Sequence, residues 1–262
     1  MNGSVFSEEI DVERIAHESF TSDVRWFAEI DSTNDHALRL SSEPGLKSPI
    51  LIVADEQTAG RGRGRNRWWT GPGSLAFSLL CDPKAWGVVA PGAPLSLAVG
   101  VALVEAVSAR SAGSTVGLHW PNDVFAGTKK ISGVLVEGAA RGLVVVGVGL
   151  NVNNSTAGAP PEVAALATSL IDLAHRPQSR TDVLIDVLFA LDRAFSALGR
   201  NDPALGRRFD DLCLQRERDM IVDNGPESTA GVCRGVAPDG ALLLDTMQGV
   251  KRVYSGVVRK TN

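Results

Sequence analysis

The chain contains only three cysteines among 262 residues, at Cys81, Cys213 and Cys233. Their wide spacing gives neither a disulfide framework nor a Cys-x-x-Cys motif, and it favours a reducing compartment. No apolar run approaches the roughly 18 residues that a membrane span needs. The acidic N-terminal segment, residues 1–18, also lacks the apolar core of a signal peptide. We therefore expect a cytoplasmic protein with no membrane partner.

Positive charge is not in excess either, because 26 Lys and Arg residues face 30 Asp and Glu residues. The net charge of −4 does not favour nucleic acid or anionic lipid as a partner, so any anion site must be local. The residues His17, His36 and His175 have no metal-ligand spacing. A Gly-x-Ser-x-Gly elbow, a Walker loop and a dinucleotide glycine fingerprint are absent too. We expect no metal centre built from side chains, no hydrolase triad and no P-loop.

The overall composition, with 44% hydrophobic and 21% charged residues, is that of a globular protein. The length suits one or two domains. Apolar or amphipathic spacing predicts helices at 94–110, from 161 and at 181–198, the last with Thr181 as its N-cap. Helices grouped around neighbouring strands, rather than in strict alternation, indicate an α+β layer fold. Short β-branched runs predict the strands of its sheet at 24–30, 50–55, 74–80, 115–120, 131–137 and 143–152.

The pattern changes near residue 214, where helical spacing gives way to short strands at 220–222, 231–236, 241–245 and 251–254. Asn-Gly and Asp-Gly pairs between them favour tight hairpins, because Gly adopts positive φ freely. We expect a larger domain of residues 1–213 and a small all-β domain of residues 214–262 packed on it.

The segment 60–69 holds four arginines, three alternating glycines and no acid. Guanidinium groups suit bidentate contact with phosphate or carboxylate, so we expect this loop to be mobile when empty and to order around an anion. Two alternatives stay open. The loop is a solvated charge run, or it binds nucleic acid on its phosphates, with Trp68 and Trp69 stacking on bases.

Four further segments carry polar or glycine patterns, each with an ordinary structural explanation. Residues 31–34 fit a helix N-cap, and residues 119–123 fit a proline turn. Lys130, directly before a buried strand, fits an edge lysine. Gly147 and Gly149 stand at period two in one strand, where a bulge or the close approach of a flat ligand would explain them.

Taken together, these segments resemble biotin–protein ligase. The matching blocks, in chain order, are Asp31-Ser32-Thr33-Asn34, Glu56-Gln57-Thr58-Ala59-Gly60-Arg61-Gly62-Arg63, Trp120-Pro121-Asn122-Asp123, Lys130-Ile131-Ser132-Gly133-Val134-Leu135-Val136-Glu137, Gly147-Val148-Gly149-Leu150-Asn151-Val152-Asn153 and Ala167-Thr168-Ser169-Leu170. The resemblance runs from about residue 25 through the C-terminal β domain.

The resemblance implies a mixed-sheet catalytic domain of the class II aminoacyl-tRNA-synthetase and biotin ligase type, followed by an SH3-like barrel. It implies that ATP and biotin form biotinyl-5′-adenylate with Mg²⁺, and that a lysine of a biotin carboxyl carrier domain then takes the biotinyl group. The catalytic residues it implies are Arg63, Lys130 and Asp123. The biotin-binding residues are Ser32, Thr33, Asn34, Gln57, Gly60, Arg61, Gly62, Arg63, Lys130 and Gly133. The ATP-binding residues are Arg65, Arg67, Trp68, Asn122 and Asn151.

Two departures from the family pattern matter. His119 stands where many members carry lysine, which makes one basic contribution weak or pH-dependent. The residues before Val24 are too few for the helix-turn-helix domain of regulatory members, so we expect no DNA partner, no repressor activity, and a monomer or weak homodimer. The alternatives are a lipoate ligase or octanoyltransferase of related fold, and a non-catalytic RNA-binding protein.

Overall fold

The computed structural model describes residues 9–89 and 91–260, so residues 1–8 of the acidic N-terminal segment lie outside the described part. The strands of the larger sheet are β1 (Asp23–Ile30), β2 (Ile50–Gln57), β3 (Leu75–Cys81), β4 (Val116–His119), β5 (Asp123–Ala126), β6 (Lys129–Gly138) and β7 (Val144–Leu150). Their spatial order is β1-β2-β3-β7-β6-β5-β4. Only β1 and β2 pair in parallel, which confirms the expected mixed sheet.

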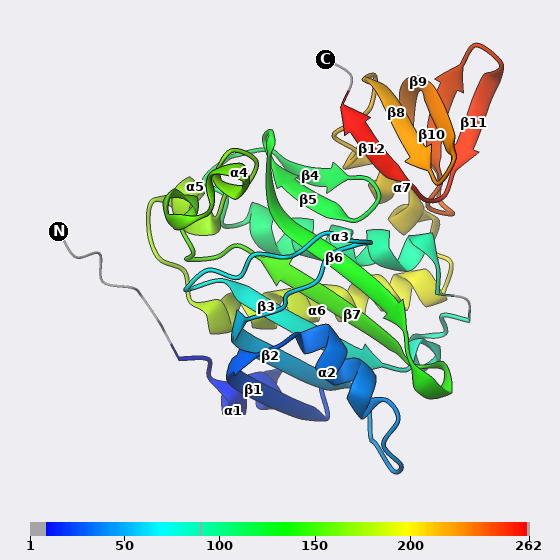
Figure 1. Ribbon diagram of the computed structural model, residues 1–262. Coiled ribbons are helices and arrows are strands. Elements are labelled where there is room, and N and C mark those ends of the chain that lie inside the picture. Colours follow the sequence, from blue (N-terminus) through cyan, green and yellow to red (C-terminus); the bar gives the residue numbers. More distant parts are fainter. Residues whose placement is uncertain (1–8, 90, 261–262) are drawn as a thin grey trace.

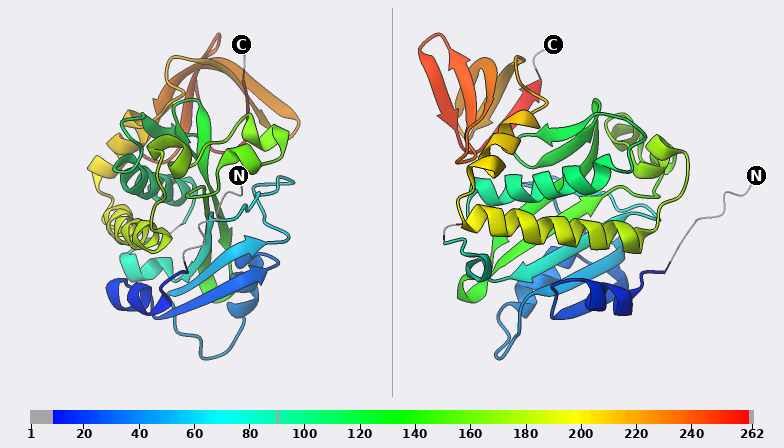
Figure 2. Two further views of the ribbon diagram at one scale, coloured as in Figure 1. Left: turned by 90° about the vertical axis from the view of Figure 1, so that its left-hand side faces the viewer. Right: turned by 180° about the vertical axis from the view of Figure 1, so that it is seen from behind.

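Helices cover the two faces of this sheet unequally. The long helices α3 (Ala93–Ser108) and α6 (Arg180–Gly199) lie side by side across one face (Figure 2), and the short helix α2 (Thr33–Leu40) lies on the other (Figure 1). Successive side chains of β7 point to opposite faces of the sheet. Val146 packs in the large core, and Val145 packs in the small core under α2. The α2 face retains room for a cavity.

The remaining helices are short. They are α1 (Val12–Glu18), α4 (Pro161–Ala164), α5 (Leu170–Ala174) and α7 (Pro203–Asp211), with 3-10 turns η1 (Pro83–Trp86), η2 (Ala140–Gly142) and η3 (Thr156–Gly158). The helix expected from residue 161 is thus α4, which ends after one turn. The expected N-cap of α6 is wrong. The Ser179 side chain, rather than Thr181, accepts the Asp182 backbone N–H, so the helix begins at Arg180.

A second sheet follows, formed by β8 (Asp219–Asn224), β9 (Glu227–Val236), β10 (Leu242–Thr246), β11 (Gly249–Val253) and β12 (Val257–Lys260). It is antiparallel throughout, in the order β11-β10-β9-β8-β12, which confirms the expected all-β structure of the C-terminal part. The strand β12 was not expected from the sequence. It returns the chain beside β8 and brings residues 256–258 to the larger sheet's cavity.

Backbone hydrogen bonds tie the two sheets together. The Leu118 N–H in β4 donates to the Leu212 carbonyl at 2.7 Å, and the Leu214 N–H donates to the Leu118 carbonyl at 2.9 Å. The indole of Trp120 donates to the Gly240 carbonyl at 3.0 Å. The predicted boundary between residues 213 and 214 therefore falls in a segment that runs along β4, and the division into domains stays a prediction.

All three cysteines are buried free thiols. Across residues 9–89 and 91–260 we find no helix that combines the length and the apolar character of a transmembrane span.

Candidate active site

A cavity of about 320 Å³ lies on the α2 face of the larger sheet, a volume suited to a small ligand. It brings together segments that are far apart in the sequence. The predicted site residues that line it are Ser32, Thr33, Asn34, Gln57, Arg61, Gly62, Arg63, Arg67, Trp68, Asn122, Asp123, Lys130 and Gly133. His119 lines it as well, with its ring stacked on Phe125 at 4.5 Å between centroids.

At one end of the cavity, at the start of α2, lies a set of neutral polar side chains that are hydrogen-bonded to one another or cap the helix. We call this set the bed, and its members are Ser32, Thr33, Asn34, Gln57 and Ser78. The backbone N–H and the hydroxyl of Thr33 both donate to Oε1 of Gln57, at 2.9 and 3.1 Å. The buried hydroxyl of Ser78 donates to Oδ1 of Asn34 at 2.6 Å and also contacts Oγ1 of Thr33 at 2.8 Å. Ser32 caps the helix by accepting the Asp35 N–H. The bed is thus fixed before any ligand arrives.

Asn34 is fully engaged within this bed. Its Nδ2 donates to Oε2 of Glu137 at 2.9 Å and to the Leu135 carbonyl at 3.4 Å, while its Oδ1 accepts from Ser78. An added Cβ on Gly147 would stand 2.0 Å from that Oδ1. Gly147 is therefore required for Asn34 to lie against the strand.

The second strand glycine, Gly149, lies under the indole of Trp68. A Cβ there would stand 2.1 Å from Cε2 of the ring, and a Cβ on Gly133 would stand 3.2 Å from Cζ3. The flat group expected against this face is thus a side chain of the chain itself. The Trp68 Nε1 is buried without a hydrogen-bond partner among the described residues, and Nζ of Lys130 lies 5.6 Å from the ring centroid.

The three predicted cations have different surroundings. Nζ of Lys130 pairs with Oδ1 of Asp123 at 2.7 Å. The Nη1 of Arg63 donates to two neutral acceptors, Oδ1 of Asn122 at 3.4 Å and the Gly256 carbonyl at 3.3 Å. Since Gly256 directly precedes β12, the C-terminal sheet also contributes to the wall of the cavity.

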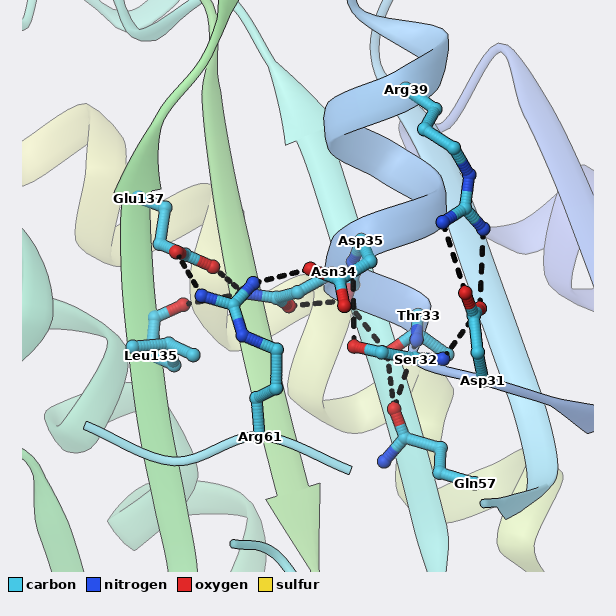
Figure 3. Close-up of polar contacts among 11 residues, drawn as sticks. Asp31, Ser32, Thr33, Asn34, Asp35, Arg39, Gln57, Arg61, Leu135 and Glu137 are labelled. Atoms are coloured by element: carbon cyan, nitrogen blue, oxygen red, sulfur yellow. Dashed lines mark hydrogen bonds and ion pairs between the residues drawn. The ribbon is translucent and has the colours of Figure 1, made fainter. Parts of the chain in front are cut away.

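The third cation, Arg61, lies between two carboxylates (Figure 3). Its Nη1 is 2.5 Å from Oδ1 of Asp35, and its Nη2 is 2.6 Å from Oε1 of Glu137. Hydrogen bonding to Glu137 and, to a smaller degree, to Asp35 raises the pKa of the Arg61 guanidinium. Neither acid had been assigned a role from the sequence.

Three predicted site residues do not line the cavity. Asn151 is buried, with Nδ2 donating to the Thr168 carbonyl and Oδ1 accepting from Asn154. Arg65 is exposed. Gly60 shapes the loop, because its carbonyl accepts the Trp68 N–H and an added Cβ would stand 2.6 Å from the Trp68 oxygen. Their assignment to ligand binding stays a prediction.

Comparison with known proteins shows which protein family this chain resembles. Residues 26–153 match the biotin/lipoate A/B protein ligase family. A biotin–[acetyl-CoA-carboxylase] ligase of Paracoccus denitrificans is 38% identical over 230 residues, which cover 83% of this chain and 92% of that protein. The ligase of the same name from Mycobacterium tuberculosis is 31% identical, over 83% and 81% of the two chains.

Among solved structures, the biotin protein ligase of Aquifex aeolicus in complex with biotin and ATP has a TM-score of 0.80 and 29% identity. The match covers 92% of this chain and all of that one. The Paracoccus and Mycobacterium relatives are at least 30% identical over most of both chains, and the chain therefore belongs to the biotin protein ligase family.

Proposed function

We propose that this chain is a biotin–[acetyl-CoA-carboxylase] ligase, which activates biotin as biotinyl-5′-adenylate and transfers it to a lysine of a biotin carboxyl carrier domain. One observation carries the assignment of roles. A fixed bed of neutral hydrogen-bonding groups and a set of cationic side chains line the same cavity. Biotin has a neutral ureido ring at one end and a carboxylate at the other, and this polarity suits the cavity.

In the first step the biotin carboxylate attacks the α-phosphorus of ATP, and pyrophosphate leaves. Both reactants are anions, so the site must hold them together against their repulsion. Lys130 and Arg63 would do so, the first from strand β6 and the second from its position beside Asn122 and Gly256. Fixed positive charge that faces the developing negative charge lowers the barrier most when water is excluded.

At the other end of the cavity, Ser32, Thr33 and Gln57 would hydrogen-bond the ureido group. Thr33 and Gln57 are held in place by their mutual hydrogen bonds, so little ordering entropy is lost on binding. The indole of Trp68 supplies an apolar surface between the bed and Lys130. Arg67 and Asn122 would face the nucleotide.

In the second step the amine of the acceptor lysine attacks the carbonyl of the mixed anhydride, and AMP leaves. Asp123 is an acidic residue that lines the cavity, and its Oδ1 contacts Lys130, so its second oxygen would be available to the incoming amine. A hydrogen bond from the amine to that oxygen would orient its lone pair.

The described residues contain no group of three or more His, Cys, Asp or Glu side chains that could hold a metal ion. Mg²⁺ is commonly bound by substrate phosphates with one or two carboxylates, so the site fits it only as part of a magnesium–nucleotide complex, with Asp123 as the available carboxylate. There it would neutralise charge on the triphosphate.

The lipoate ligase alternative predicts that lipoate replaces biotin as the activated acid. Pyrophosphate release from ATP, measured with biotin, lipoate and octanoate in parallel, separates the two. Release with biotin alone, followed by a biotin-sized mass increase on a carrier domain, supports the proposal. Release with lipoate but not with biotin refutes it.

The RNA-binding alternative needs the arginine loop to present its charge to phosphates. Arg61 pairs instead with Asp35 and Glu137, which removes one of the four cations from that purpose. Binding to RNA that weakens steeply with salt, without biotin-dependent pyrophosphate release, would favour this alternative. A cytoplasmic location, the absence of a DNA partner and a monomeric or weakly dimeric state stay predictions.

A further inference from the structure

The guanidinium of Arg61 joins three segments that are remote in sequence. Arg61 lies in the glycine–arginine loop, Asp35 lies in the first turn of α2, and Glu137 lies near the end of β6. Figure 3 shows the guanidinium between the two carboxylates. The ion pairs thereby connect the loop to α2, which carries Thr33 and Asn34 of the bed, and to β6.

The pairing satisfies the charge of Arg61 within the protein. Two carboxylates surround one guanidinium, at 2.5 and 2.6 Å, so the cluster carries a net charge of about −1 at neutral pH. Such a cluster does not attract the carboxylate of a substrate. Arg63, two residues further on, differs because its contacts among the described residues are with neutral oxygens.

Glu137 is itself held in position by the bed. Its Oε2 accepts from Nδ2 of Asn34, and Oδ1 of Asn34 accepts from Ser78. A continuous chain of hydrogen bonds therefore leads from Ser78 on the sheet, through Asn34 and Glu137, to Arg61 in the loop.

Fixing Arg61 also fixes the rest of the loop. The Gly62 N–H donates to the Asn66 carbonyl at 2.9 Å, and the Trp68 N–H donates to the Gly60 carbonyl at 3.0 Å. Glycine on both sides of Arg61 gives the backbone little stiffness of its own. The two ion pairs connect the start of the loop to α2 and β6, and they add to the contacts of Arg63 and to the packing of Trp68 further along the loop.

We propose that Asp35 and Glu137 are positioning residues for biotin activation, which act through Arg61 as a clasp that closes the loop over the bed. The proposal rests on the proposed function, and it assigns Arg61 to loop closure rather than to the substrate carboxylate. The clasp would raise the affinity for biotin by holding the loop near its closed arrangement before the ligand binds.

The test compares Glu137→Gln, Asp35→Asn, the double acid variant, Arg61→Ala and the triple variant. The chain offers a matched control, because Arg234 also lies between two carboxylates, Glu217 at 2.5 Å and Asp245 at 2.8 Å, in the C-terminal sheet. The pair Glu217→Gln and Asp245→Asn removes equivalent interactions outside the cavity. Thermal unfolding of each variant checks that the fold is kept.

The readouts are the KM for biotin and kcat in biotin-dependent pyrophosphate release, and the rate of proteolysis within residues 60–69. We expect the double acid variant and Arg61→Ala to raise KM about tenfold with a smaller change in kcat, and to speed cleavage of the loop. The triple variant, which combines Asp35→Asn, Glu137→Gln and Arg61→Ala, should show the same KM and cleavage rate as Arg61→Ala, because all three changes remove the same set of ion pairs. The control should match wild type.

If the acid variants keep the wild-type KM and cleavage rate while Arg61→Ala is impaired, Arg61 contacts the substrate directly and the clasp is refuted. If wild type releases no pyrophosphate with biotin, the proposed function fails instead. The proteolysis comparison still decides whether the acids hold the loop, since it needs no turnover.

Discussion

The indole of Trp68 lies so close to Gly149 that a Cβ on this glycine would stand 2.1 Å from ring atom Cε2. Gly149 is the second-to-last residue of β7, a fully buried strand in which glycine has no conformational advantage. Glycine is therefore required here for a steric reason, because the indole ring packs directly against the strand at this position. The ring in turn lies near Nζ of Lys130, so the glycine at position 149 affects where the indole lies relative to that lysine.

We expect Gly149→Ala to lower adenylate formation at least tenfold, because the added methyl group must displace the indole into the ligand space. Overpacking of this kind costs about 1 to 3 kcal/mol, which the loop can relieve by moving away. Initial rates of pyrophosphate release measure the effect. Gly138→Ala on β6 is the control, since an added Cβ there meets nothing within 4 Å. Equal rates for wild type and Gly149→Ala would refute the steric role.

Lys130 and Arg63 are the two cations that we expect to act on the reactants, so removal of either should slow adenylate formation. We expect Lys130→Ala and Arg63→Ala to lower adenylate formation by about 10²- to 10³-fold, the usual scale for one lost electrostatic contact with a transition state. The melting temperature should barely change. The exposed neighbour Lys129 provides the control for Lys130, and Lys129→Ala should retain the wild-type rate. A wild-type rate in Arg63→Ala or Lys130→Ala would show that the assigned role is wrong.

The C-terminal domain should influence activation through Gly256, whose carbonyl accepts from Arg63. A Cβ on Gly256 would stand 2.5 Å from Cγ1 of Val222 and 2.8 Å from the Asp223 oxygen. We expect Gly256→Ala to shift this turn and lower the rate about tenfold. Gly225→Ala is the control, since it also has positive φ but no neighbour within 4 Å. If the two variants have the same rate, the carbonyl of Gly256 does not position Arg63.

Stability should depend strongly on a buried ion pair behind the site. Arg180, at the first position of α6, is 2% exposed, and its Nη1 lies 2.5 Å from Oδ1 of Asp55, which is 27% exposed. Asp55→Asn leaves a buried cation without that carboxylate and should cost about 3 kcal/mol of unfolding free energy. Arg180→Met should cost less, because Asp55 retains access to water. Urea unfolding measures both, and a milder effect of Asp55→Asn would contradict the argument.

Long periodic elements could be predicted from the sequence because burial imposes a strong pattern on them. The helix α3 and the helix α6 were placed within one or two residues, and so were most strands. Short elements were missed. The strand β5 begins at Asp123, directly after a Pro-Asn pair that is typical of a turn, and β12 is only four residues long. The helix α7 was missed although Asp202 and Pro203 are typical start signals.

The site could be predicted only in part, because sequence patterns identify segments but not the contacts between them. The resemblance named most residues that line the cavity. It could not identify Ser78, a hydroxyl within an apolar strand, or the partners of Arg61, which lie 26 and 76 residues away. It also assigns Asn151 to ATP binding, which stays a prediction, and both polar atoms of that side chain form hydrogen bonds within the fold.

We expect biotin to lie with its ureido ring on the bed and its carboxyl group toward Lys130 and Arg63. A crystal structure of the complex with biotinyl-5′-adenylate would show this orientation. The ureido group should then lie within hydrogen-bond distance of Thr33 and Gln57, with Nζ of Lys130 at the acyl phosphate. Electron density for the ligand in the reverse orientation, or outside this cavity, would contradict it.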